Sequence, residues 1–182
     1  MPNLKINPFL ILIIGAVSIA FSPIFVRLSE VDPIMTAFFR IFVSLPFFLM
    51  FGSLKIIEKV NFPVLKDKFL IIFISGIFFS LDLICWHLSI KLTTVSKATF
   101  LSNLAPIVVI LFSLIFLKEK FSKFFFIAIF ISMSGMTMLL GESFQFYKSQ
   151  FLGDLLGVLT AIWYGCYTVS YTHLRAHETI AD

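Results

Sequence analysis

Apolar residues along this chain gather into six long runs that are separated by short polar segments. Each run is 17 to 22 residues long, and a helix of roughly 20 residues crosses the hydrocarbon core of a bilayer. The pattern therefore predicts an all-α membrane protein with six transmembrane helices. The predicted helices are Phe9–Val26, Pro33–Phe51, Phe69–Ile90, Ala98–Leu117, Phe124–Leu140 and Leu152–Tyr171.

Composition supports this class of protein and excludes others. Hydrophobic residues make up 59% of the 182 residues, and the mean hydropathy is +1.04, far above that of a soluble domain. No polar stretch is long enough for a soluble catalytic or nucleic-acid-binding domain, so we expect no nucleic-acid partner. The first run has only Lys5 as a basic flank and no small-residue cleavage site after it, which favours a retained helix over a signal peptide.

Metal and disulfide chemistry find little support in the sequence. Cys85 and Cys166 both fall inside predicted helices, which argues against a disulfide framework or a zinc site. His173 and His177 lie in a polar tail without an evident third ligand. We therefore predict neither a metal nor a cofactor.

The distribution of Lys and Arg predicts the orientation of the helices. A cytoplasmic N-terminus places nine basic loop residues inside and four outside, the four being Arg27, Lys91, Lys97 and Lys148. Cytoplasmic loops carry an excess of Lys and Arg. We therefore predict a multi-pass protein of the cell inner (cytoplasmic) membrane with its N-terminus in the cytoplasm. Lys91 and Lys97, on the predicted outer side, are the main exceptions to the rule.

Three prolines and several rows of small residues interrupt the apolar runs. Pro23, Pro46 and Pro106 each remove a backbone donor inside a predicted helix, which produces either a tolerated kink or a hinge that exposes a carbonyl to a cavity. Small residues four positions apart let membrane helices approach closely. The sixth run carries such a row. Gly135 and Gly141, near the end of the fifth run, are assigned to close packing and helix termination. The row in the sixth run is Gly153, Gly157, Ala161 and Gly165.

Arg40 is the most informative polar residue, because it lies in an apolar run without a charged neighbour in its own helix. A charged side chain within a membrane segment faces protein or water and has a partner, unless it snorkels to the interface. Asp82 in the next predicted helix lies ~12 Å below the outer end, and Arg40 lies ~10 Å below it, at 1.5 Å per residue. We hypothesise that the two form an ion pair or line one aqueous cavity.

Four further polar or aromatic residues lie near the same depth. Asn103 enters the fourth predicted helix from the outer side, and Thr160 is a further candidate for this polar layer. His87 does not share a helical face with Asp82, so it belongs either to the headgroup region beside Trp86 or to a proton-handling site. A cavity with a basic, an acidic and an amide group suits a zwitterionic or polar metabolite.

The segment from 78 to 122 resembles the middle of an EamA-type transporter of the drug/metabolite transporter superfamily. The residues that carry the resemblance are Asp82, Trp86, His87, Ser89, Thr93, Thr94, Ala98, Leu101, Ala105, Pro106 and Glu119. The segment from 25 to 44 resembles the first two helices of the same repeat, with Arg40 at the recurrent arginine of the family. The resemblance covers residues 9–141 and implies one five-helix repeat.

The remainder of the chain departs from that family. Full members have ten helices in two inverted repeats, and the segment from 153 to 167 resembles the first helix of the second repeat. We therefore expect 152–169 to be the first helix of a truncated second repeat. Residues 170–182 resemble a translated adaptor, so a non-native polar tail is favoured over a genuine cytosolic one.

The resemblance and the polar layer together predict a secondary transporter, here a fragment, which moves a small polar metabolite or drug-like solute by alternating access. The alternative is a non-transporting membrane subunit, or a half-transporter that acts as a homodimer; the inside bias of the lysines argues against two oppositely inserted copies. No ATP-binding GxxxxGK[ST] motif is present. An intramembrane enzyme is disfavoured because Asp82, His87 and Ser89 spread around the helix.

The residues proposed for the substrate path are Arg40, Asp82, Trp86, His87 and Asn103, and those proposed for hinges or packing are Pro46, Pro106, Gly157 and Gly165.

Overall fold

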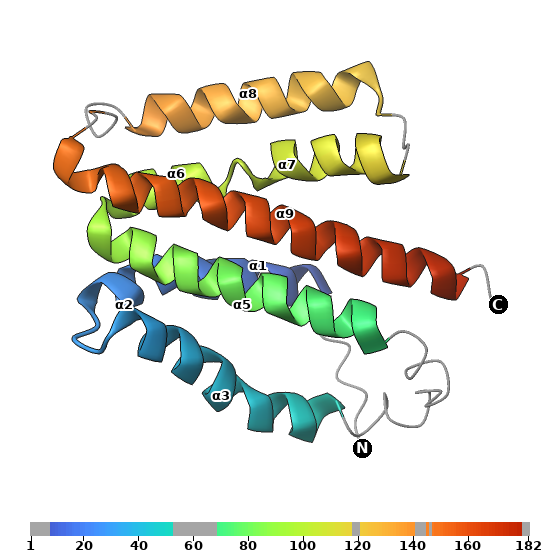
Figure 1. The fold of residues 1–182 in the computed structure, drawn as a ribbon, viewed down its shortest axis with the longest axis horizontal. Coiled ribbons are helices and arrows are strands. Elements are labelled where there is room, and N and C mark those ends of the chain that lie inside the picture. The colour runs from blue at the N-terminus through green and yellow to red at the C-terminus, as the bar shows by residue number, and fades with distance from the viewer. Residues whose placement is uncertain (1–7, 53–68, 118–120, 141–144, 146, 180–182) are drawn as a thin grey trace.

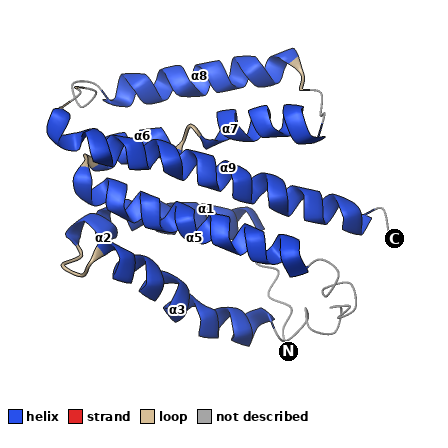
Figure 2. Ribbon diagram, viewed as in Figure 1, coloured by secondary structure: helices blue, strands red, loops and turns tan. Residues whose placement is uncertain are grey.

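The computed structural model describes residues 8–52, 69–117, 121–140, 145 and 147–179. Within this part of the chain every regular element is a helix (Figures 1 and 2). The elements are α1 (Pro8–Ala20), α2 (Ser22–Leu28), α3 (Pro33–Gly52), α5 (Phe69–Leu92), α6 (Val95–Ser102), α7 (Ala105–Phe112) with a π-helical turn (Ser113–Leu117), α8 (Lys123–Leu140), a 3-10 turn (Lys148–Gln150) and α9 (Phe151–Thr179).

These elements form six rods that run back and forth along one axis (Figure 1). The rods are α1 with α2, α3, α5, α6 with α7, α8 and α9. Five of them are long and apolar enough to cross a membrane, and the sixth contains the shorter apolar helix Lys123–Met138. The all-α membrane fold and the six predicted helix positions are therefore confirmed.

Two of the six rods are broken, and a proline follows each break. The first predicted helix divides at Phe21, and Pro23 lies in the first turn of α2. The fourth divides at Asn103 and Leu104, and Pro106 lies in the first turn of α7. Proline is tolerated in a first turn because the N–H it lacks would have no partner there. In contrast, α3 continues through Pro46.

Helix α9 packs closely against its neighbours, and the row of small residues along it allows this close approach. A Cβ on Gly153 would lie 2.7 Å from the backbone of Leu92 and Thr93. On Gly157 it would lie 2.9 Å from Cβ of Leu101, and on Gly165 it would lie 2.6 Å from Cγ1 of Val108. The row therefore lets α9 lie directly against α5, α6 and α7, as its four-residue spacing predicts (Figure 1).

Two expectations about the later part of the chain need correction or comment. Gly135 was expected to support close packing, but a Cβ there would meet nothing within 4 Å, because this face of α8 is open. Gly141 lies outside the described residues. The segment assigned to a tail from residue 170 continues α9 as far as Thr179, because it contains no proline or glycine to end the helix.

Two basic side chains join the ends of α2 and α5. The guanidinium of Arg27 donates to the carbonyl oxygens of Ile90, Lys91 and Thr93, at 2.6, 2.9 and 3.2 Å. The ammonium of Lys91 donates in return to the carbonyl oxygens of Arg27, at 3.3 Å, and Ser29. The last carbonyls of a helix lack partners within the helix, so each basic residue caps the helix to which it does not belong.

Candidate functional site: a polar cavity within the bundle

All six rods contribute to one cavity of about 1300 Å³. Most of its lining is apolar, and its polar groups come from α2, α3, α5, α6 and α9 together with the break that follows α6. Four of the five residues predicted for the substrate path line this cavity, and Thr160 lines it as well. The four are Arg40, Asp82, Trp86 and Asn103.

Arg40 and Asp82 share the cavity without a direct ion pair. The guanidinium carbon of Arg40 lies 5.4 Å from the centroid of the Trp86 ring, which is a cation–π distance. Asp82 is only 7% exposed, and it lies within electrostatic range of Arg40. Of the two arrangements expected from matching depth, the shared cavity is therefore the one that the structure shows.

The break between α6 and α7 places further polar groups at this cavity. Asn103 lies in the break and donates from Nδ2 to the carbonyl oxygen of Thr99 at 2.8 Å. Ser102 and Pro106, on either side of it, also line the cavity. Because Pro106 has no N–H, it cannot satisfy the carbonyl of Ser102 four residues earlier. The interrupted helix thus brings the amide side chain of Asn103 to the cavity wall.

His87 lies apart from this cavity. Its side chain is fully buried, and it lines a second cavity of about 640 Å³ together with residues of α1, α2 and α3. It also packs edge-on against the Trp86 ring at 5.0 Å between centroids. His87 is therefore enclosed by protein, because α2 and α3 pack against α5. Its place in the headgroup region or in a proton-handling site stays a prediction.

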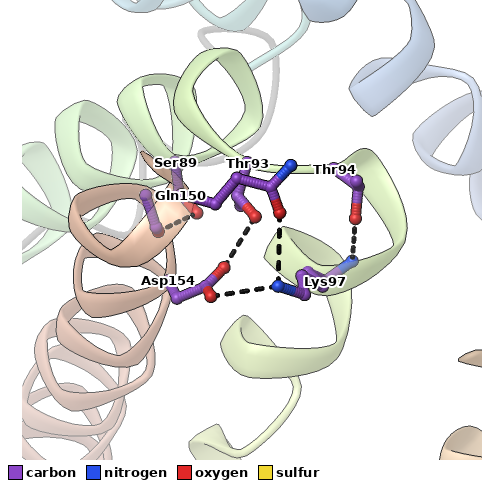
Figure 3. Close-up of polar contacts among 7 residues, drawn as sticks. Ser89, Thr93, Thr94, Lys97, Gln150 and Asp154 are labelled. Carbon is purple, nitrogen blue, oxygen red and sulfur yellow. Dashed lines mark hydrogen bonds and ion pairs between the residues drawn. The ribbon is translucent and has the colours of Figure 1, made fainter. Parts of the chain in front are cut away.

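One polar cluster at the end of the bundle was not predicted. Lys97 in α6 and Asp154 in α9 form an ion pair at 3.2 Å, with side-chain exposures of 5% and 9%. Asp154 also accepts a hydrogen bond from the hydroxyl of Thr93 at 2.6 Å, and Lys97 donates to Oε1 of Gln150 at 3.3 Å (Figure 3). Beside them, the hydroxyl of Ser89 donates to the carbonyl oxygen of Gly153 at 2.7 Å (Figure 3).

A signal for this cluster was present in the sequence. Lys97 directly precedes one predicted helix and Asp154 stands near the start of another, so both lie at the same end of the bundle. The depth comparison that placed Arg40 beside Asp82 would have placed these two residues together as well. The count of basic loop residues places Lys97 only among the outer loop residues. In the structure Lys97 lies three residues after Thr94, the N-cap residue of α6, and it is buried.

A helical bundle with apolar rods, around a mostly apolar cavity that carries a few polar and charged groups, defines a polytopic membrane protein built around a solute-sized space. The sequence model of the EamA-like transporter family matches residues 7–141 of the chain, which run from before α1 to the end of α8. The chain therefore belongs to the EamA-like transporter family. No curated protein and no solved structure matches it.

Membership of this family makes the chain a membrane transporter of the drug/metabolite type, and it argues against an enzyme. The recurrent arginine position that the sequence suggested, Arg40, is the residue that places a cation on the cavity wall. Helix α9 lies beyond the matched residues, although it lines the same cavity through Thr160 and Tyr164. Glu119, the acidic residue that follows the fourth predicted helix, lies outside the described residues.

Proposed function

We propose that the chain carries a small zwitterionic or polar metabolite, or a drug-like solute, across the cytoplasmic membrane by alternating access. The observation that supports this most strongly is the placement of Arg40 and Asp82 on the wall of one cavity to which all six rods contribute. Ionisable residues in membrane segments are costly and mark solute or ion pathways. A solute with a carboxylate and an ammonium group matches the two charges.

The helix breaks supply the movable parts of this mechanism. Interrupted helices near a binding site are a recurring device of secondary transporters. The breaks at Phe21 and at Asn103–Leu104 both adjoin residues of the cavity wall. Rotation at these breaks would open the cavity toward one side of the membrane while the intact helix α5 holds Asp82 in place. We further propose that residues 9–141 form one repeat and that 152–169 begin a second.

A cytoplasmic N-terminus remains our proposal for the orientation. Three of the four basic residues on the proposed outer side have internal roles, because Arg27 and Lys91 cap helices and Lys97 pairs with Asp154. The presence of Lys91 and Lys97 on that side therefore has a structural explanation. Lys148 is exposed and remains as the outer loop cation.

Cysteine labelling will test this orientation. Lys148→Cys, made with Cys85→Ser and Cys166→Ser, should react with a membrane-impermeant maleimide in intact cells. Lys123→Cys at the start of α8 should react only after lysis, because it lies at the opposite end of the bundle. The reverse labelling pattern would refute the cytoplasmic N-terminus.

Transport itself is tested in sealed proteoliposomes that are preloaded with a mixture of radiolabelled L-amino acids as zwitterionic probes. Arg40→Ala and Asp82→Ala should each lower the release rate about tenfold or more, since each removes a charge-assisted contact of about 1.5–3 kcal/mol with the solute. Lys148→Ala removes an exposed cation and should leave the rate unchanged. Release that does not differ between Arg40→Ala and the parent chain would refute the proposed path.

A further inference from the structure

The charged groups of the cavity of about 1300 Å³ lie at one level of the bundle. Arg40 and Asp82 are the charged residues among those described on its wall. Helices α3 and α9 begin, and α5 ends, at the end of the bundle that carries Asp154 (Figure 1). At 1.5 Å per residue, Arg40, Asp82 and Thr160 all lie ~10 to 15 Å from that end. A solute in the cavity therefore meets both charges at a similar depth.

Further from that end, the same three helices present apolar side chains to the cavity. They form a part of the wall that we call the apolar chamber, and its residues are Leu45 and Phe48 of α3, Phe79 of α5 and Tyr164 of α9. The exposed fractions of these four residues are 50%, 72%, 36% and 44%. A solute in the cavity therefore has accessible side-chain surface to contact. The hydroxyl of Ser44, on the same wall, donates to the carbonyl oxygen of Ile41 at 2.8 Å, so it is satisfied within its own helix.

The lining face of α3 gives the length of the apolar chamber. Arg40, Ile41, Ser44, Leu45 and Phe48 all line the cavity, and their spacing is that of one helical face. Eight positions separate Arg40 from Phe48 in the sequence, which corresponds to ~12 Å along the helix. An extended chain advances ~1.2 Å per bond. An unbranched chain of about ten carbon atoms therefore reaches from the level of Arg40 to Phe48.

The chemistry of the apolar chamber selects the part of the solute that it contacts. A small zwitterion held at Arg40 and Asp82 would leave the chamber to water, which finds few hydrogen-bond partners on an apolar wall. An alkyl tail would instead remove the wall and itself from water, and each buried methylene group raises affinity up to about fourfold. The two-part wall therefore matches a solute that has a charged head and an apolar tail.

We propose that the solute is a single-chain amphiphile, with a zwitterionic head and an unbranched alkyl tail of about eight to ten carbon atoms. The carboxylate of the head lies at Arg40 and its ammonium group lies at Asp82. The tail fills the apolar chamber as far as Phe48. This inference deepens the proposed transport function, because it names the class of solute for the same cavity, and it rests on that function for the passage across the membrane.

A series of α-amino acids with unbranched side chains of two, four, six, eight, ten and fourteen carbon atoms will test the apolar chamber. Equilibrium dialysis measures the affinity of each probe for the full chain in lipid nanodiscs, and protein-free nanodiscs correct for partition of the probe into lipid. Affinity should rise about two- to fourfold per added methylene group. The rise should level off near ten side-chain carbon atoms, where the tail has passed Phe48.

Substitutions separate the head of the solute from its tail. Arg40→Gln and Asp82→Asn should weaken every probe by about tenfold and leave the gain per methylene group unchanged. Leu45→Trp fills the apolar chamber and should make the rise level off several carbon atoms earlier. Leu49→Trp is the matched control on the same helix, because Leu49 is exposed and is not among the described residues of the cavity wall. Ser44→Phe fills the chamber from the neighbouring position and replaces Leu45→Trp if that variant does not fold.

Three results would overturn the amphiphile proposal. They are affinity that does not change with tail length, a gain that continues undiminished to fourteen carbon atoms because the tail lies in lipid, and a series in the chamber-filling variant equal to that of Leu49→Trp. These outcomes are distinct from a failure of the transport proposal. Binding that depends on tail length, without Arg40-dependent release from proteoliposomes, would refute transport and retain the amphiphile site. Arg40-dependent release with affinity independent of tail length would do the reverse.

Discussion

Asp154→Ala should lower the free energy of unfolding by about 3 kcal/mol, because it leaves the Lys97 ammonium buried without its carboxylate partner. Both side chains are less than a tenth exposed, and the same carboxylate accepts the hydroxyl of Thr93. The Oε1 atom of Gln150 at 3.3 Å and the Tyr147 ring at 6.0 Å remain near the ammonium. They keep the loss at the lower end of the range for a broken buried pair.

Equilibrium unfolding of the purified chain in mixed micelles by sodium dodecyl sulfate would measure this change. Glu30→Ala serves as the control, because Glu30 is an exposed carboxylate in the α2–α3 connection, and its loss should change the free energy by less than about 0.5 kcal/mol. The double variant Lys97→Met with Asp154→Leu replaces the pair by apolar side chains and should regain most of the stability. A loss in Asp154→Ala no larger than that in Glu30→Ala would show that the pair does not hold α9 to α6.

Gly153→Ala should destabilise the protein by about 1–3 kcal/mol through overpacking. The added methyl group would lie 2.7 Å from the backbone carbon of Leu92 and the backbone nitrogen of Thr93. Backbone atoms cannot rotate aside, so α9 must move away from the α5–α6 turn. That movement also lengthens the Ser89–Gly153 hydrogen bond and the contacts of Asp154.

Gly135→Ala is the matched control for Gly153→Ala. It places the same methyl group on α8, at a position where nothing lies within 4 Å, and it should leave stability unchanged or raise it by up to about 1 kcal/mol. The loss of stability in Gly165→Ala should lie between those of the other two variants. The atom nearest to its added methyl group is a side-chain methyl group of Val108, which can move aside more easily than backbone. Equal unfolding curves for Gly153→Ala and Gly135→Ala would contradict the close approach of α9.

Helix positions and the placement of Arg40 and Asp82 in one cavity were predictable because both follow from one-dimensional rules. A run of apolar residues long enough for the bilayer specifies a helix, and the rise per residue specifies the depth of Arg40 and Asp82. The row of small residues in α9 was readable for the same reason, since its period is that of a helix face.

Other features depend on three-dimensional neighbours and were missed. The burial of His87 follows from the cover supplied by α2 and α3, which periodicity within α5 does not reveal. The sequence also does not say that Arg40 turns toward the ring of Trp86 instead of the carboxylate of Asp82, because side-chain choice among several neighbours is a property of packing. Gly135 shows the converse, because a small residue in a helix does not by itself imply a close neighbour.

The reciprocal caps of Arg27 and Lys91 have a consequence for biogenesis. The residues that they join are 62 to 66 positions apart in the chain, so α5 must be synthesised and inserted before either cap can form. Until then the carbonyl groups at the end of α2 depend on water at the membrane surface. The first hairpin thus reaches its final stability only when the third rod arrives, which ties the order of assembly to the order of translation.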